Sequence, residues 1–182
     1  MKASVSSNAF TRFVLVSGGL YLCLYLIYQF VVKKYTYYDQ QFISYIIYSA
    51  DFVLHAFGFE TFKSIQAVDF QVVGVDGSNG VWIGSNCNAI KLFGLFTVFI
   101  VAYPGAVKHK LWYIPSGIVL IHFLNILRVA ALAVIAKNAP AYLDFNHTYT
   151  FTLIVYGFIF LLWIIWVNRF SNTGNKDALK QN

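Results

Sequence analysis

Charged residues are scarce in this sequence, and their scarcity decides the class of protein. Asp, Glu, Lys and Arg make up 11% of the 182 residues, whereas 59% of the residues are hydrophobic. A typical soluble domain carries about 25% charged residues. The composition therefore excludes an ordinary soluble domain and predicts an integral membrane protein.

Cysteine is also rare, because the chain contains only Cys23 and Cys87. Cys23 lies in the centre of the first hydrophobic run, and we expect it to pack there. The different membrane depths expected for the two thiols, and the lack of a Cys-x-x-Cys motif, argue against a disulfide oxidoreductase. The turn at 76–80 offers one carboxylate where a calcium loop needs several oxygen ligands. The sequence thus predicts no metal and no organic cofactor.

Apolar runs predict four transmembrane helices, because about 20 residues of helix cross a bilayer. The first run is longer than the core of a signal peptide, so we expect it to remain as an anchor. Residues 42–59 carry Asp51 and His55 on one helical face. We expect this segment to lie in the interface; if it spans instead, the helices number five. The four runs are 13–32, 88–103, 111–136 and 148–167.

Residues 67–84 change character and contain two short strand-like runs around an Asp-Gly-Ser-Asn-Gly turn, which predicts a β-hairpin outside the membrane. Trp82 on this hairpin is expected to anchor at the interface or to form a wall over a substrate. The predicted fold class is an all-α polytopic membrane protein with a small hairpin. Residues 1–168 form one domain, and the polar residues 169–182 form a cytoplasmic tail.

The positive charge predicts orientation rather than nucleic-acid binding. The net charge is +6, but Lys and Arg lie mainly in short flanks between apolar runs. Basic flanks of this kind face the cytoplasm. Lys108, Lys110 and Arg169 therefore mark the cytoplasmic side of the membrane, whereas the hairpin, Cys87 and His147 face outward. The lipid bilayer is the expected surrounding, and nucleic acid is not a partner.

Cys87 lies in a polar Ser-Asn-Cys-Asn stretch that opens an apolar run. If Ser85 or Asn86 caps the helix, Cys87 lies in its first turn, where the helix dipole favours a thiolate. Lys91, four residues on, would add a cation on the same face. The competing interpretation is a buried structural cysteine.

Arg128 lies inside a predicted span, where an arginine is costly unless it faces the bundle interior or a wet cavity. His122 and Asn125 precede it at three-residue steps and share its face; we expect them to support packing or the site. His147 begins the last span on the outer side, level with Cys87.

Cys87, Arg128 and His147, in this order, resemble the exosortase and archaeosortase family, in particular its exosortase F branch. The matching pieces are Cys87-Asn88-Ala89, Asn125-x-x-Arg128 and His147, within residues 60–168. The resemblance implies a membrane-embedded cysteine transpeptidase or protease, in which Cys87 is the nucleophile, Arg128 stabilises the oxyanion and His147 transfers protons. Asn88, Asn125 and Lys91 would support them.

By the same resemblance, the substrates would be exported proteins with a C-terminal sorting signal, cleaved at the outer face of the membrane. An accessory membrane protein would be a further partner. Whether water or an amine accepts the acyl group stays open.

Two other functions are compatible with the sequence. In the first, the chain is a non-catalytic membrane subunit for assembly or transport, and Arg128 forms a buried ion pair with Asp51. In the second, His55 and His122 bind haem within a helical bundle. Thiol labelling distinguishes the first from an enzyme, and visible absorbance tests the second.

Overall fold

The computed structural model describes residues 7–32, 36–65, 70–85 and 87–171. The predictions for Asn86, for residues 66–69 and for the tail beyond 171 lie outside these ranges. The helices are α1 Ser7–Ile27, α2 Thr36–Ala56, α3 Ile90–Ala102, α4 Val107–Asn138, α5 Leu143–Phe145 and α6 Phe151–Arg169. The π-helical turns Tyr28–Val32 and Asn146–Thr150 and the 3-10 turn Pro140–Tyr142 join them. The strands are β1 Thr61–Ser64, β2 Phe70–Val75 and β3 Val81–Gly84.

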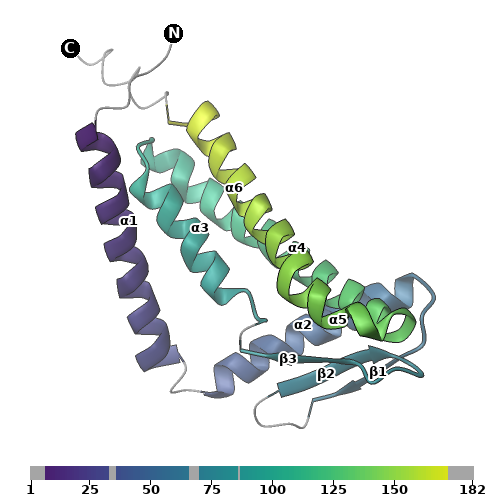
Figure 1. Ribbon diagram of the computed structural model, residues 1–182. Coiled ribbons are helices and arrows are strands. Elements are labelled where there is room, and N and C mark those ends of the chain that lie inside the picture. Colours follow the sequence, from purple (N-terminus) through teal and green to yellow (C-terminus); the bar gives the residue numbers. More distant parts are fainter. Residues whose placement is uncertain (1–6, 33–35, 66–69, 86, 172–182) are drawn as a thin grey trace.

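The long helices α1, α3, α4 and α6 run lengthwise, and the sheet lies at one end of them (Figure 1). The start of α1 and the end of α6 lie at the opposite end. Among the described residues, three helical segments are long and apolar enough to cross a membrane: Thr11–Phe30, Val107–Asn138 and Pro140–Arg169. The fourth predicted span is shorter, because α3 has 13 residues, or roughly 20 Å of helix.

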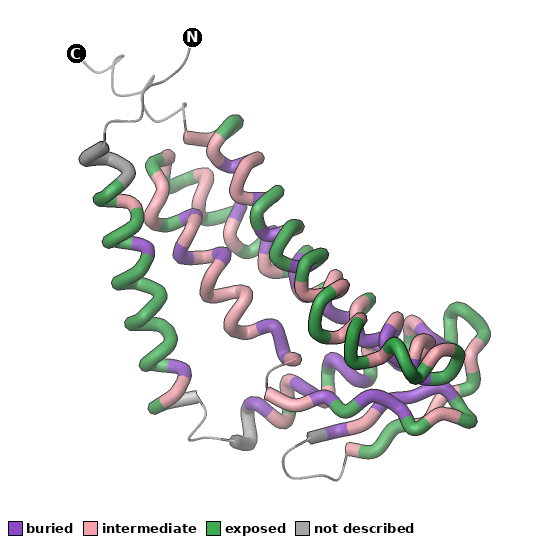
Figure 2. The backbone as a smooth tube through the Cα atoms, viewed as in Figure 1, coloured by how far each residue is buried: buried purple, intermediate pink, exposed green. Residues whose placement is uncertain are grey.

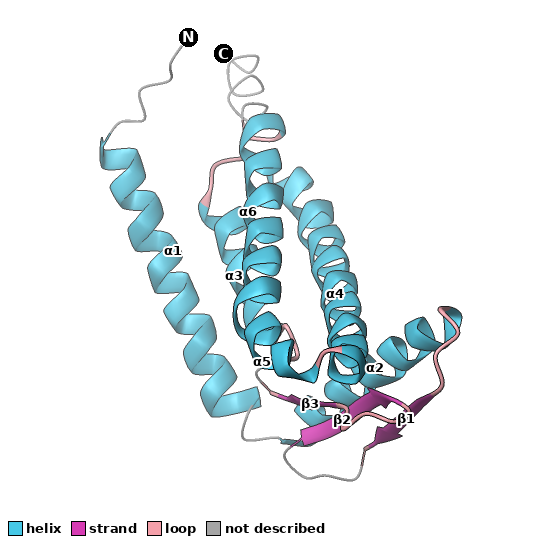
Figure 3. Ribbon diagram, turned by 45° about the vertical axis from the view of Figure 1, so that its right-hand side comes forward, coloured by secondary structure: helices cyan, strands magenta, loops and turns pink. Residues whose placement is uncertain are grey.

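The helix α2 is not one of these long apolar segments but lies across the sheet end of the bundle, as Figure 3 shows. One stripe of α2 at helical spacing is fully or nearly fully buried: Ile43, Ile46, Ile47, Ala50 and Leu54. These side chains pack against apolar residues of the sheet and of α4. Such a stripe needs a partner on one side only, which explains why α2 covers the sheet.

The predicted hairpin is present as β2 and β3, but a third strand extends it. The antiparallel order is β1-β2-β3, with Thr61 opposite Val75 and Ser64 opposite Val72. A side chain at Gly74 would meet the backbone of Gly80 at 2.6 Å. Gly74 therefore leaves room for the backbone just before β3, where a larger residue would not fit.

A second core holds α3, α4 and α6 together. Gly117 of α4 allows this close approach, because a Cβ there would lie 2.2 Å from the ring of the fully buried Phe96. The outward faces are different: α1 is exposed along most of its length (Figure 2), although its sequence is apolar. Apolar side chains thus cover the outside of the bundle as well as its core. The buried residues of this core are Phe96, Ile100, Tyr113, Ile121, Val155, Ile159, Leu162 and Trp166.

Candidate functional site

Cys87 and His147 lie next to each other at the sheet end of the bundle. The Sγ atom of Cys87 is 3.4 Å from Nε2 of His147, although the two residues are 60 positions apart. This distance is within hydrogen-bonding range for sulfur, as a nucleophile and its base require. The thiol is partly buried and packs against the core between α2, the sheet and α4.

The local structure around Cys87 differs from the expected capped helix. α3 begins at Ile90, and Ala89 precedes it in the left-handed conformation with φ 62°. Cys87 lies in the loop before it, with its N–H donated to Gly84 O at 2.8 Å. The prediction that Cys87 lies in the first helical turn is therefore wrong. A non-glycine residue in this conformation costs about 1–3 kcal/mol, a strain that often marks functional loops.

Hydrogen bonds from two directions hold the Cys87 loop. The carboxylate of Asp39 in α2 accepts hydrogen bonds from Ser85 Oγ and from Asn88 Nδ2, on either side of the thiol. From α4, Asn125 Nδ2 donates to the carbonyl of Cys87 at 3.0 Å. Asp39, Asn88 and Asn125 are all buried. Ser85 thus binds Asp39 instead of capping a helix.

His147 is carried by the π-helical turn Asn146–Thr150 at the start of the last long helix. Its backbone carbonyl lies 3.4 Å from Arg128 Nη2 and 3.4 Å from Thr152 Oγ1, both of which donate to it. Single π-turns occur frequently at functional sites. The guanidinium of Arg128 therefore contacts the backbone of His147, whose side chain contacts Cys87.

A pocket of about 180 Å³ is lined by Arg128 and by Asn88, the residue after Cys87, whereas Cys87 and His147 themselves are not in its lining. The charged residues in its lining, Lys91 and Arg128, are both cations. Such a pocket favours an anionic group, or the charge that develops on a carbonyl oxygen under attack. The lining consists of Asn88, Ala89, Lys91, Leu92, Arg128, Thr152, Val155 and Tyr156.

Lys91 does not occupy the position expected for it. Because Cys87 precedes α3, a four-residue helical spacing does not relate the two side chains. The ammonium of Lys91 lies 5.9 Å from the centre of the Tyr28 ring, on the side of α1. Lys91 therefore belongs to the wall of the site and to the interface between α1 and α3.

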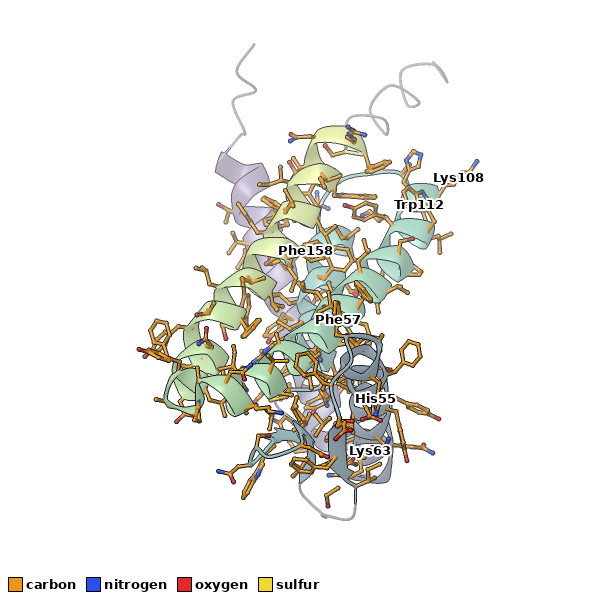
Figure 4. The ribbon with its side chains drawn as sticks, turned by 90° about the vertical axis from the view of Figure 1, so that its right-hand side faces the viewer. His55, Phe57, Lys63, Lys108, Trp112 and Phe158 are labelled. Carbon is orange, nitrogen blue, oxygen red and sulfur yellow. The ribbon has the colours of Figure 1, made fainter. Side chains whose placement is uncertain are left out.

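The ion pair proposed for the non-catalytic alternative is not formed. Asp51 instead accepts hydrogen bonds from Lys63 and Thr61, and His55 Nδ1 lies 3.5 Å from it. Figure 4 shows His55 and Lys63 near each other at the sheet end. This cluster joins α2 to β1.

Two other predicted residues lie away from the Cys87 and His147 pair. His122 packs against Phe42 of α2, with 5.5 Å between ring centroids, and His55 lies roughly 20 Å further along the same helix. Cys23 is exposed on the outside of α1, so the prediction that it packs within a core is wrong. Asp39 was missed because its contacts with the Cys87 loop span more than 40 positions, and no local motif signals them.

No family model, curated protein or solved structure matches the chain. In the part of the chain that the structure describes, no group of three or more His, Cys, Asp or Glu residues could hold a metal ion. The chemistry of the site therefore rests on the geometry of Cys87, His147 and Arg128.

Proposed function

We propose that this protein is a multi-pass membrane cysteine peptidase or transpeptidase that cleaves the C-terminal sorting signals of exported proteins. The observation that carries the proposal is the 3.4 Å approach of Cys87 Sγ to His147 Nε2. Three long apolar helices and an apolar exterior support the membrane setting. The resemblance to exosortases supports the substrate class.

In the first step, Cys87 Sγ attacks the scissile carbonyl and its proton passes to His147. The sulfur–carbon bond forms as the carbonyl becomes an oxyanion, and Arg128 on the pocket wall stabilises this charge. His147 then returns the proton to the leaving amine, and the carbon–nitrogen bond breaks. The product is a thioester on Cys87.

In the second step, an amine or a water molecule attacks the thioester. His147 removes a proton from this acceptor, the carbon–sulfur bond breaks and the proton returns to the sulfur. An amine acceptor gives transpeptidation, whereas water gives hydrolysis. The mass of the new C-terminus of the product distinguishes the two reactions.

The basic residues support an outward-facing site in the bacterial inner membrane. Lys108 lies at the opposite end of the bundle from His55 and the sheet (Figure 4), and Arg169 ends α6 at the opposite end from the sheet. Basic residues favour the cytoplasmic side. The sheet, Cys87 and His147 would then face the exterior.

The test is a comparison of Cys87→Ala with Cys23→Ala in the host that produces the protein. We expect Cys87→Ala to stop the processing of exported proteins that end in an apolar helix and a basic tail, because the nucleophile is lost. Cys23→Ala should process them normally, since Cys23 lies on the outside of α1. Both variants should accumulate in the membrane, as measured by immunoblotting and C-terminal mass spectrometry.

Normal processing by Cys87→Ala would remove the enzymatic proposal. Thiol labelling separates an enzyme from a non-catalytic subunit. A membrane-impermeant maleimide added from outside should modify Cys87 faster than Cys23, and a His147→Ala exchange should slow the reaction at Cys87. Equal labelling of both thiols would favour the non-catalytic subunit.

A further inference from the structure

An apolar groove lies between α1 and α3. Its volume is about 340 Å³, which is within the usual size of ligand sites. Among the described residues that line it, Lys91 carries the only charge. The lining consists of Tyr21, Leu24, Tyr25, Ile27, Tyr28, Ile90, Lys91, Phe93, Gly94 and Thr97.

The charged group of this groove lies at its sheet end, beside a tyrosine ring. Lys91 lies in the first turn of α3, and its ammonium is 5.9 Å from the ring centre of Tyr28, the first residue after α1. Tyr25, one turn earlier, is hydrogen-bonded through its hydroxyl oxygen to Gln29. A cation beside tyrosines at the end of a long apolar helix is the arrangement found at the headgroup level of a bilayer.

The groove follows the helices away from this end. Tyr28 and Tyr21 both line it, and seven residues of helix correspond to roughly 10 Å. Further along α1, the ring of Phe13 packs against Tyr103 and Trp163, with centroids 5.6 and 6.1 Å away. The groove is therefore an elongated apolar slot with a cation at one end. Its predominantly apolar lining matches an acyl chain.

We propose that an anionic phospholipid occupies this groove, with its phosphate against Lys91 and an acyl chain along Leu24, Phe93 and Gly94. The proposal rests on the membrane setting of the proposed function, but not on its peptidase chemistry. Lys91 also lines the pocket beside Arg128. The lipid headgroup would thus border this pocket.

Gly94 and Gly157 provide a matched test of the apolar part. A Cβ at either glycine meets no atom within 4 Å, but only Gly94 lines the groove. The full chain is placed in phosphatidylcholine nanodiscs that contain a trace of phosphatidylglycerol with a photoactivatable acyl chain. We expect adducts on peptides of α1 and α3, reduced several-fold by Gly94→Phe and unchanged by Gly157→Phe.

Lys91→Gln and Lys108→Gln test the polar part. Labelling by phosphatidylglycerol should exceed labelling by a matched photoactivatable phosphatidylcholine about fivefold. This ratio corresponds to the attraction of about 1 kcal/mol between one lysine and an anionic headgroup. Lys91→Gln should abolish this preference. Lys108→Gln should keep it, because Lys108 is exposed at the other end of the bundle. Each variant is first compared with the parent protein by thermal unfolding.

Three outcomes would overturn the proposal. Labelling of α1 and α3 that Gly94→Phe does not change would indicate ordinary annular lipid. Equal labelling by the two lipids would remove the role of Lys91, and competition by inorganic phosphate would indicate a site for a soluble anion. Cys87→Ala should label like the parent protein, so failure of the peptidase proposal and failure of the lipid proposal are distinguishable.

Discussion

Replacing Asp39 should disable the site although Asp39 is not in contact with Cys87. Its carboxylate is 5% exposed and accepts hydrogen bonds from Ser85 and Asn88, which flank the thiol. Asp39→Ala leaves both donors without this acceptor. We expect the loop between β3 and α3 to shift, and Cys87 to move relative to His147.

The magnitude follows from burial. Asn88 is 1% exposed, and an unpaired buried polar group costs about 1–3 kcal/mol, with a similar net value for a hydrogen bond to a charged group. With the smaller loss at the half-buried Ser85, we expect Asp39→Ala to lower the free energy of unfolding by about 2–4 kcal/mol. A displacement of about 1 Å at a reacting atom can cost on the order of 100-fold in rate.

An exchange of the two side chains separates hydrogen bonding from general instability. In Asp39→Asn the new amide can accept from Ser85 but opposes the amide of Asn88. In the double variant Asp39→Asn, Asn88→Asp, the donor and acceptor are reversed and the bond can form again. Processing and thermal unfolding in detergent should both recover in the double variant relative to Asp39→Asn.

The control is Asp76→Asn, which removes an acid from the exposed turn between β2 and β3. Parent-like processing and unfolding in Asp39→Asn would refute the role of this carboxylate. A double variant no better than either single variant would refute the direct bond between positions 39 and 88.

Three further predictions concern other parts of the molecule. Gly117→Ala should lower the free energy of unfolding by about 1–3 kcal/mol, because its Cβ would lie 2.2 Å from a buried phenylalanine ring. Gly157→Ala has open space around its Cβ and should not destabilise the protein. Thermal unfolding measures both variants. Burial, the largest single effect, raises the pKa of Asp51, but the hydrogen bonds from Lys63 and Thr61 and the charges of Lys63 and His55 together outweigh it, so this pKa is lowered. The stability contributed by Asp51 is therefore complete above the ordinary carboxyl pKa of about 4 and is lost as the pH falls through the lower folded value. Asp51→Asn should remove this loss from the acid-unfolding profile. An unchanged profile would contradict a stabilising role of the Asp51 carboxylate. Arg128→Lys should lose most processing, since a single ammonium does not reproduce the planar donors of a guanidinium; full activity would make Arg128 structural.

The elements with a local signal were predictable, and those set by distant contacts were not. The turn at 76–80 and the short strand-like runs on either side of it predicted β2 and β3. β1 was missed because Thr61–Ser64 is a short, half-exposed edge strand, which β2 positions by backbone pairing. α3 was predicted too long, since nothing in the sequence marks the left-handed residue Ala89 that delays its start.

The site shows the same division. Cys87, Arg128 and His147 could be chosen because a thiol, a cation and an imidazole are rare in apolar spans. Only some of the side chains that hold the Cys87 loop could be predicted from the sequence. Asn125 shares a helical face with Arg128, but Asp39 reaches the loop only after α2 folds across the sheet.

If the proposed peptidase activity is correct, the position of Cys87 also changes how the reactivity of its thiol must arise. A thiol in the first turn of a helix would be activated by the helix dipole, independently of distant residues. Cys87 instead lies before α3, with its N–H bonded to Gly84 and its carbonyl bonded to Asn125. The neighbouring group that can accept its proton is His147, 3.4 Å away. Activation therefore depends on the packing of the π-helical turn Asn146–Thr150 against the loop before α3, and any change that separates these two segments should silence the thiol while leaving the helices intact.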